Sequence, residues 1–199
     1  MTPTADRAAV GFDLDMTLVD SRPVSRRALE CLVEEHGHDL DVEMLMAAYG
    51  LPLSQWLAPG TDSELFRALQ QQDVSDVVAM PGAFTAVDAA RQAGHRVVVV
   101  TAAPSALAAT MLQAVGLRVD VLRADVWAAG KVQPLRDERC WAFIGDHADD
   151  MQAARDAGTI AIGVSSGTSP PYGADVDLGS LERFPAWLIS QEAANARPT

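Results

Sequence analysis

The segment Val10-Gly11-Phe12-Asp13-Leu14-Asp15-Met16-Thr17-Leu18-Val19-Asp20 contains two closely spaced aspartates, which follow an apolar run over residues 8–12. This run predicts a buried strand that ends in a loop carrying both carboxylates. Alternation along a strand would place Asp13 and Asp15 on the same side. Neighbouring carboxylates repel each other and are costly to desolvate, and Mg²⁺, which prefers oxygen ligands, resolves this conflict. The segment therefore predicts a magnesium site with a nucleophile beside it.

The composition is typical of a folded globular protein with an acidic surface. The chain has 199 residues, of which 49% are hydrophobic and 21% charged, so we expect one domain, or one domain with a modest insertion. The 15 Lys and Arg against 27 Asp and Glu give a formal net charge of −12. This charge argues against nucleic acid or an anionic membrane as the main partner. It is compatible with a small anionic substrate, because a metal ion and one lysine can reverse the field locally.

The cysteines and the N-terminal residues predict a cytoplasmic protein. Cys31 and Cys140 do not form a C-x-x-C pair, and two cysteines are too few for the usual structural zinc site, so we expect both to be reduced. Residues 1–8 include Asp6 and Arg7 and have no long apolar core. We therefore expect neither a signal peptide nor a membrane span.

Strand-like runs alternate with helical stretches, which indicates an α/β fold with a parallel sheet. The further predicted strands cover residues 96–101, 119–122, 141–145, 160–164 and, more weakly, 176–178. The predicted helices cover residues 83–92, 105–115 and 149–157, each followed by a glycine that can end a helix, and residues 180–189, where Pro185 interrupts the pattern. Together they predict a Rossmann-like, doubly wound parallel sheet.

Residues 21–80 break this alternation. Helical patterns cover residues 23–36, 42–49 and 63–80 with no convincing strand, and such a block is too long for an ordinary crossover. Leu51-Pro52-Leu53 and Ala58-Pro59-Gly60 separate the helical patterns, and Pro81-Gly82 marks the return to the sheet. We expect an inserted helical cap domain at residues 21–80 and a catalytic core domain formed by residues 1–20 and 81–199.

Three more groups of polar residues lie where predicted strands end, which is where open α/β sheets bind ligands. Thr101 ends a strand with four consecutive valines, and Ala102-Ala103-Pro104 follows at a helix start, where a hydroxyl and free N–H groups can hold an anion. Lys131, in Gly130-Lys131-Val132, is the only lysine in the chain. Gly145-Asp146-His147-Ala148-Asp149-Asp150 forms an acidic cluster after the strand at residues 141–145.

In this order, the D-x-D-x-T pattern at residues 13–17, Thr101, Lys131 and the acidic cluster resemble the motifs of the haloacid dehalogenase-like superfamily. The chain is most similar to the branch of phosphoglycolate phosphatases with a helical cap, and the resemblance covers nearly all of it. The resemblance implies a Mg²⁺-dependent phosphatase that acts on a small phosphomonoester, phosphoglycolate-like or a sugar phosphate. The reaction would pass through an aspartyl-phosphate intermediate.

The resemblance divides the work between the two aspartates. Asp13 would be the nucleophile and would also bind Mg²⁺. Asp15 would offer its backbone carbonyl to the metal, while its side chain protonates the leaving oxygen and later deprotonates the attacking water. Dehalogenase relatives lack a carboxylate at this second position because a halide leaving group needs no proton. Asp15 therefore favours phosphate esters.

The resemblance assigns the phosphate-binding groups as well. Thr101 and the main-chain amides near Leu14 and Ala102 would hold phosphate oxygens, and Lys131 would neutralise the nucleophile and the phosphoryl group. The span between Lys131 and the acidic cluster is short and contains a proline, which predicts a shortened helix. Two arginines are therefore kept as alternative cations: Arg123 and Arg136.

In the acidic cluster, Asp146 would be the side-chain ligand of Mg²⁺. Asp150 would orient Lys131 or metal-bound water, Thr17 would support the site, and Asp149 is interpreted as a helix cap. Two departures from the pattern are Met16, where relatives usually have glycine, and His147, where a serine or threonine is frequent. We interpret His147 as a loop residue without a metal role.

Two other functions are consistent with these motifs. A sugar-phosphate mutase of the same superfamily would retain a phosphorylated sugar intermediate, and a non-catalytic module would bind a phosphorylated metabolite without turnover. The sequence specifies neither the substrate nor the oligomeric state. The cap residues that we expect to face the substrate are Tyr49, Leu51, Gln55 and Trp56.

Overall fold

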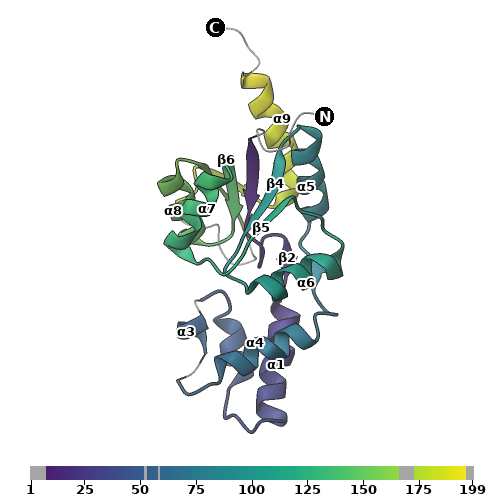
Figure 1. The fold of residues 1–199 in the computed structure, drawn as a ribbon, viewed down its shortest axis with the longest axis vertical. Coiled ribbons are helices and arrows are strands. Elements are labelled where there is room, and N and C mark those ends of the chain that lie inside the picture. The colour runs from purple at the N-terminus through teal and green to yellow at the C-terminus, as the bar shows by residue number, and fades with distance from the viewer. Residues whose placement is uncertain (1–7, 52, 58, 166–172, 196–199) are drawn as a thin grey trace.

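A six-stranded sheet with the order β5-β4-β1-β6-β7-β8 forms the centre of the protein (Figure 1). The computed structural model describes residues 8–51, 53–57, 59–165 and 173–195. All neighbouring strands of this sheet pair in parallel. In chain order, the strands are β1 (Ala9–Phe12), β4 (Arg96–Val100), β5 (Val121–Arg123), β6 (Cys140–Gly145), β7 (Ile160–Val164) and β8 (Val176–Gly179).

The central strand β1 is buried along its whole length because β4 and β6 pair with it on either side. Gly11 makes the close packing on one face possible. A Cβ atom at this position would lie 2.9 Å from the Phe143 ring, which is closer than a side chain tolerates. The apolar run that predicted this strand is thus explained by burial on both faces.

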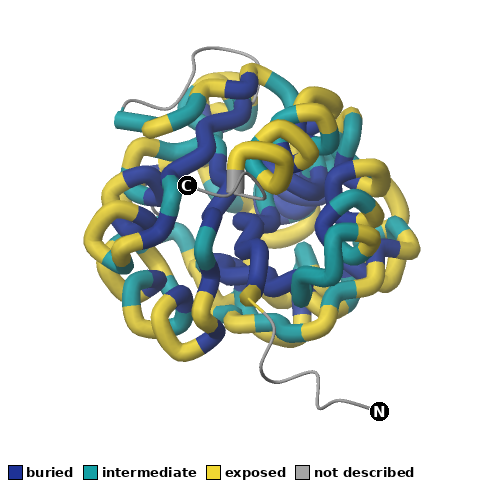
Figure 2. The backbone as a smooth tube through the Cα atoms, turned by 90° about the horizontal axis from the view of Figure 1, so that it is seen from above, coloured by how far each residue is buried: buried dark blue, intermediate teal, exposed yellow. Residues whose placement is uncertain are grey.

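Helices cover both faces of the sheet, so the predicted doubly wound fold is confirmed. Along β4, Val97 and Val99 pack into one hydrophobic cluster and Val98 and Val100 into a second one on the other face. The first cluster includes side chains of α5 (Ala83–Gln92), α6 (Ser105–Val115) and α9 (Phe184–Asn195). The second includes side chains of α7 (Val132–Asp137) and α8 (Ala148–Ala157). Figure 2 shows buried backbone at the centre and exposed backbone along the periphery.

Among the described residues, four helices lie between the short strands β2 (Val19–Asp20) and β3 (Val78–Ala79), which pair antiparallel. They are α1 (Arg22–Glu34), α2 (Val42–Ala47), α3 (Leu53–Trp56) and α4 (Ser63–Gln72). These helices enclose a hydrophobic cluster of their own, which includes Leu29, Trp56 and Phe66. In Figure 1 these helices lie below the six-stranded sheet, past β2 and α6.

The predicted helix over residues 63–80 was wrong at its C-terminal end. Helix α4 ends at Gln72, and the side chain of Asp73 accepts the N–H of Ser75 at 2.9 Å, a local turn that competes with the helix. Val78 and Ala79 then pair with β2. Short strands of this kind carry too little periodic pattern to be recognised in the sequence.

Pro185 does not interrupt the last helix, because α9 begins at Phe184 and proline is tolerated in the first turn. The short span after Lys131 forms the six-residue helix α7, as the position of Pro134 predicted. Among the described residues, no helix is both long enough and apolar enough to cross a membrane.

Candidate active site

The predicted site residues converge at the carboxyl end of the sheet. Asp13 follows β1, Thr101 follows β4 and Asp146 follows β6. The chain leaves β1 toward β4 and β5 and later returns to place β6 on its other side, so β1 lies at the point where the strand order reverses. Open α/β sheets form their ligand crevices at this point. The N–H of Asp13 donates to the carbonyl of Ile144 at 2.8 Å, which fixes the nucleophile candidate next to β6.

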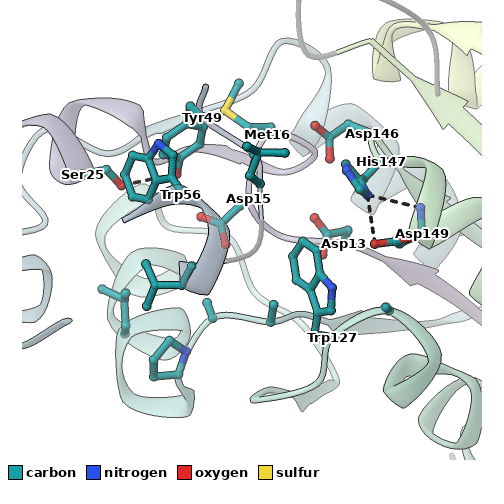
Figure 3. A pocket seen from close by; sticks show the side chains of 18 of the residues that line it. Asp13, Asp15, Met16, Ser25, Tyr49, Trp56, Trp127, Asp146, His147 and Asp149 are labelled. Carbon is teal, nitrogen blue, oxygen red and sulfur yellow. Dashed lines mark hydrogen bonds and ion pairs between the residues drawn. The ribbon is translucent and has the colours of Figure 1, made fainter. Parts of the chain in front are cut away.

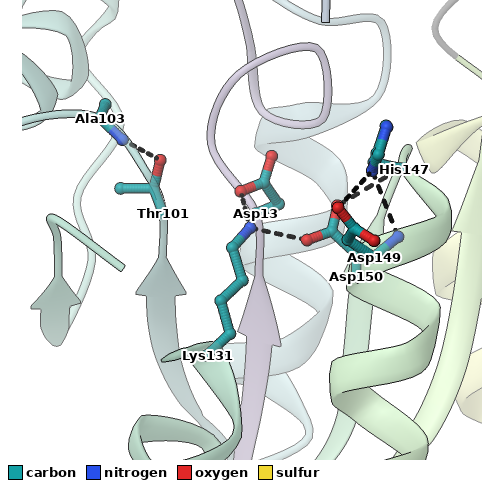
Figure 4. Close-up of polar contacts among 7 residues, drawn as sticks. All are labelled: Asp13, Thr101, Ala103, Lys131, His147, Asp149 and Asp150. Atoms are coloured by element: carbon teal, nitrogen blue, oxygen red, sulfur yellow. Dashed lines mark hydrogen bonds and ion pairs between the residues drawn. The ribbon is translucent and has the colours of Figure 1, made fainter. Parts of the chain in front are cut away.

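Lys131 joins two of the acidic residues (Figure 4). Its Nζ lies 2.6 Å from Oδ1 of Asp13 and 2.6 Å from Oδ1 of Asp150, and all three side chains are buried. Burial lowers the pKa of Lys131, but Asp13 and Asp150 outweigh it and raise the pKa above its ordinary value. The lysine therefore stays charged, and ammonium donors to carboxylates form strong hydrogen bonds.

The two alternative cations lie elsewhere. Nε of Arg123 donates to Oε1 of Glu138 at 3.0 Å, and Nη2 of Arg136 donates to the carbonyl of Asp156. The structure thus brings Lys131, and neither arginine, into contact with Asp13.

Three carboxylates of the site form a group that suits a divalent cation. One oxygen each of Asp13, Asp146 and Asp150 lies within 4.8 Å of the others. Burial raises the pKa of Asp13, and Lys131 opposes this effect. The neighbouring charges of Asp150, Asp146 and Asp15 raise the pKa of Asp13 further. Additional positive charge would therefore stabilise the ionised carboxylate, and an all-oxygen donor set matches the preference of Mg²⁺. The side chain of Asp15 is outside this group.

The side chain of Asp15 points instead into a chain of hydrogen bonds. The Ser21 hydroxyl donates to Asp15, and Ser21 Oγ lies 2.7 Å from the Tyr49 hydroxyl. Ser25 Oγ is 3.4 Å from the same phenol oxygen, and Gln70 Nε2 donates to Ser25 Oγ at 2.9 Å. If each hydroxyl donates once, every donor points toward Asp15. The chain thus connects α1 and α4 with the candidate acid–base residue.

Burial shifts the pKa values of Asp15 and Tyr49, the two titratable groups in this series of hydrogen bonds. Burial raises the pKa of Asp15, and the hydrogen bond from Ser21 partly counteracts this effect. Burial and the Asp15 charge raise the pKa of Tyr49, which keeps the phenol protonated and able to donate. The pKa of Asp15 is thus shifted in the direction that a general acid requires.

The remaining predicted phosphate-binding residues follow β1 (Leu14) and β4 (Thr101 and Ala102). Thr101 is buried, and its Oγ1 accepts the N–H of Ala103 at 3.1 Å, so its own hydroxyl hydrogen is free to donate (Figure 4). Ala102 lines the cavity described below. Leu14 begins a tight turn, because its carbonyl accepts the N–H groups of Leu18 and Val19. Thr17 Oγ1 is buried and has no hydrogen-bond partner among the described residues.

The two departures from the family pattern have local explanations. Met16 has φ 60°, in the left-handed region that favours glycine, and its buried side chain lines the cavity (Figure 3). The turn is thus retained in spite of the side chain. Nδ1 of His147 accepts the N–H of Asp149 at 3.2 Å, so the imidazole caps α8. Asp149, interpreted as the cap from the sequence, lies in the first turn instead.

A cavity of about 590 Å³ is lined by the site residues Asp13, Asp15 and Asp146, among others (Figure 3). Tyr49, Leu51 and Trp56 line it as expected, whereas Gln55 is exposed and is not among the lining residues. Further lining residues were not anticipated from the sequence: Ser25, Phe66, Arg67, Gln70, Asp125 and Trp127. The cavity therefore lies between the end of the sheet and the helices of residues 21–80.

Comparisons with known proteins agree with this geometry. The sequence profile of haloacid dehalogenase-like hydrolases matches residues 10–155. A plasmid-encoded phosphoglycolate phosphatase from Cupriavidus necator is 31% identical over an alignment of 221 positions, which covers 94% of this chain and 96% of the relative. This relationship confirms the prediction that the protein is a hydrolase of the phosphatase class.

Two solved structures show the same fold. A haloacid dehalogenase-like family hydrolase from Streptococcus pneumoniae has a TM-score of 0.74 at 17% identity, covering 94% of this chain and 98% of that chain. CbbY from Rhodobacter sphaeroides, solved with phosphate, has a TM-score of 0.66 at 21% identity, covering 88% of this chain and 95% of that chain. With the profile match and the phosphatase relative, these findings show that the chain belongs to the haloacid dehalogenase-like hydrolase family.

Proposed function

We propose that this protein is a Mg²⁺-dependent phosphatase that hydrolyses a small phosphomonoester through a phosphorylated Asp13. The observation that carries the proposal is the buried contact of 2.6 Å between Lys131 Nζ and Asp13, within reach of Asp146 and Asp150. A carboxylate that must approach a phosphate needs nearby positive charge, and this arrangement provides it. The phosphoglycolate phosphatase relative supports the same class of reaction.

In the first step, an oxygen of Asp13 attacks phosphorus and the bond between phosphorus and the leaving oxygen breaks. Asp15 gives its proton to the leaving oxygen, and Lys131 and the Thr101 hydroxyl offset the charge on the phosphoryl oxygens. Mg²⁺, held by the carboxylates of Asp13 and Asp146 and the backbone carbonyl of Asp15, with Asp150 in support, would supply further positive charge. The products of this step are the alcohol and the acyl phosphate of Asp13.

In the second step, water attacks the phosphorus of the acyl phosphate and Asp15 accepts a proton from it. Inorganic phosphate leaves and the Asp13 carboxylate is regenerated. We propose that the helices of residues 21–80 act as a cap in both steps. Tyr49, Trp56 and Phe66 line the cavity from that side and would exclude bulk water from the reacting groups.

Purified protein tests this function directly. With p-nitrophenyl phosphate and 2-phosphoglycolate, we expect phosphate release in Mg²⁺, a loss of roughly 100-fold or more in EDTA, and recovery when Mg²⁺ is restored. Activity that EDTA does not change would contradict the metal assignment. Transfer of labelled phosphate to a retained sugar would indicate the mutase, and saturable binding without turnover would indicate the non-catalytic module.

Ser21→Ala tests the hydrogen bonds that lead to Asp15. The variant loses the donor that stabilises the ionised carboxylate, so the pKa of Asp15 should rise further. Because Asp15 acts as an acid in its protonated form, the alkaline limb of the pH profile of kcat/KM should shift to higher pH. We also expect kcat to fall by roughly 10-fold, since general acid–base catalysis depends on orientation.

Ser21→Thr is the matched control because it keeps the hydroxyl, and its pH profile should resemble that of the wild type. A profile of Ser21→Ala that superimposes on the wild-type profile would contradict the role assigned to this contact.

A further inference from the structure

Helix α1 ends in a group of three different metal-ligating side chains. One ligand atom each of Cys31, Glu35 and His36 lies within 4.8 Å of the others. Among the described residues, the carboxylates of the candidate active site are the other group that meets this condition, and they offer oxygen alone. Two cysteines are too few for the usual structural zinc site, but a single thiolate can combine with nitrogen and oxygen ligands. The end of α1 thus offers a donor set of different chemistry.

The backbone at the end of α1 brings these side chains together. Cys31 and Glu35 are four residues apart, so their side chains lie on the same face of the helix end. The N–H of Glu35 donates to the carbonyl of Cys31 at 2.9 Å, which fixes the last turn. Gly37, with φ 71°, then turns the chain away directly after His36. Six consecutive residues therefore supply all three ligands.

The charges at this end of α1 favour a cation. The negative pole of the helix dipole lies here, and Glu34 and Glu35 add two carboxylates, whereas the last turn has no basic residue. In the part of the chain that the structure describes, Glu34, Glu35 and His36 take part in no ion pair. A bound cation would offset this local excess of negative charge.

The group is separate from the candidate active site and open to solvent. Cys31, Glu35 and His36 are not among the residues that line the cavity. Cys31 lies ten residues beyond Ser21, the N-cap of α1, which corresponds to about 15 Å along the helix axis. Cys31 is half-buried, and Glu35 and His36 are exposed. An ion can therefore reach the three ligands, and a fourth position stays open to water.

Thiolate, imidazole and carboxylate are the ligand types of Zn²⁺, whereas Mg²⁺ prefers oxygen ligands. We propose that Cys31, Glu35 and His36 bind one Zn²⁺ ion, with water as the fourth ligand. On binding, the ion replaces the thiol hydrogen of Cys31, which is released to solvent as a proton. The site does not depend on the proposed phosphatase function. Because it joins the last turn of α1 to the residues that follow, the bound ion stabilises this helix end.

Titration of the purified, reduced protein with Co²⁺ tests the site. Co²⁺ accepts the same ligands as Zn²⁺ and, when bound to a thiolate, gives a charge-transfer absorption band in the near ultraviolet. The oxygen ligands of the candidate active site cannot give this band. In excess Mg²⁺, we expect the band to develop with one equivalent of Co²⁺ and to disappear when Zn²⁺ displaces it. Zn²⁺ should also raise the Tm of the protein in Mg²⁺.

Variants of the three ligands and of two matched controls assign the band. Cys31→Ser should abolish it, and Glu35→Gln and His36→Gln should each weaken Co²⁺ binding by roughly 10-fold or more. The controls are His38→Gln, which changes a histidine close to the group but outside it, and Cys140→Ala, which removes the other thiol. Both controls should bind Co²⁺ as the wild type does.

The inference is overturned if the wild type gives no thiolate band or if the band survives in Cys31→Ser. It is also overturned if Glu35→Gln or His36→Gln binds Co²⁺ as tightly as the wild type, or if His38→Gln weakens binding equally. Saturation at half an equivalent would show that two copies share the ion, which contradicts a site within one chain. Phosphate release is not used in any of these measurements, so failure of the proposed function leaves their outcome unchanged.

Discussion

Asp13→Asn is expected to lower phosphate release by roughly 10⁴-fold or more, since the amide cannot form the acyl phosphate. The variant should remain folded. Lys131 keeps its contact of 2.6 Å with Asp150, and the substitution removes one charge from a crowded group of buried carboxylates. The measurement is phosphate release in Mg²⁺ with p-nitrophenyl phosphate, together with a thermal unfolding curve.

Asp149→Asn is the matched control for this prediction. Asp149 lines the same cavity but makes no contact with Lys131, so the same change there should alter kcat by only a few-fold. Asp13→Ala measured in parallel excludes activity regained by deamidation of asparagine. Wild-type turnover in both Asp13 variants would remove Asp13 from the role of nucleophile.

Lys131→Met is expected to affect both stability and catalysis. The variant leaves Asp13 and Asp150 buried without their shared cation, a change that destabilises proteins by about 3–5 kcal/mol when a buried pair is broken. We expect kcat to fall by roughly 10³-fold, because the charge that faces the phosphoryl group is lost.

The loss of stability in Lys131→Met should depend on pH. In the wild type, Lys131 lowers the pKa of Asp13 against the effect of burial, so its removal raises that pKa further. A carboxyl whose pKa is higher in the folded state stabilises the fold at low pH and loses this effect as pH rises. The destabilisation should therefore be larger at pH 7.5 than at pH 5, as measured by urea unfolding at both values.

Two further variants make the prediction for Lys131 decisive. Arg136→Gln removes a cation that the sequence left as an alternative, and it should change neither stability nor kcat by more than a few-fold, because Arg136 donates only to an exposed carbonyl. Lys131→Arg keeps the charge and should fold while losing activity through altered geometry. A Lys131→Met protein with wild-type stability and turnover would contradict the account of the site.

Much of the fold could be predicted because strong local patterns coincide with burial. The valines of β4 alternate between two hydrophobic clusters, and α5 and α6 lie at residues 83–92 and 105–115 as their patterns predicted. The strand at β3 could not be predicted. It has two residues, and its pairing with β2 depends on a partner almost sixty positions earlier in the chain.

The candidate site was predictable to the extent that it lies on strand ends. Parallel strands bring their carboxyl ends together, so Asp13, Thr101 and Asp146 could be expected to meet before any distance was known. The contact of Ser21 with Asp15 and the lining of the cavity by Phe66 and Gln70 depend on how the helices of residues 21–80 pack against the core. No periodicity in the sequence records that packing. The same limit explains why Gln55 was expected in the cavity and Phe66 was not.

The central claim, that Asp13 becomes phosphorylated during turnover, is tested most directly by trapping. The enzyme is mixed with substrate and Mg²⁺, quenched with acid and reduced with borohydride, which converts an aspartyl phosphate to homoserine. Peptide mass spectrometry should then find homoserine at position 13 in the wild type and not in Asp13→Ala. Rapid phosphate release with unmodified Asp13, or with the reduced product at another aspartate, would contradict the account.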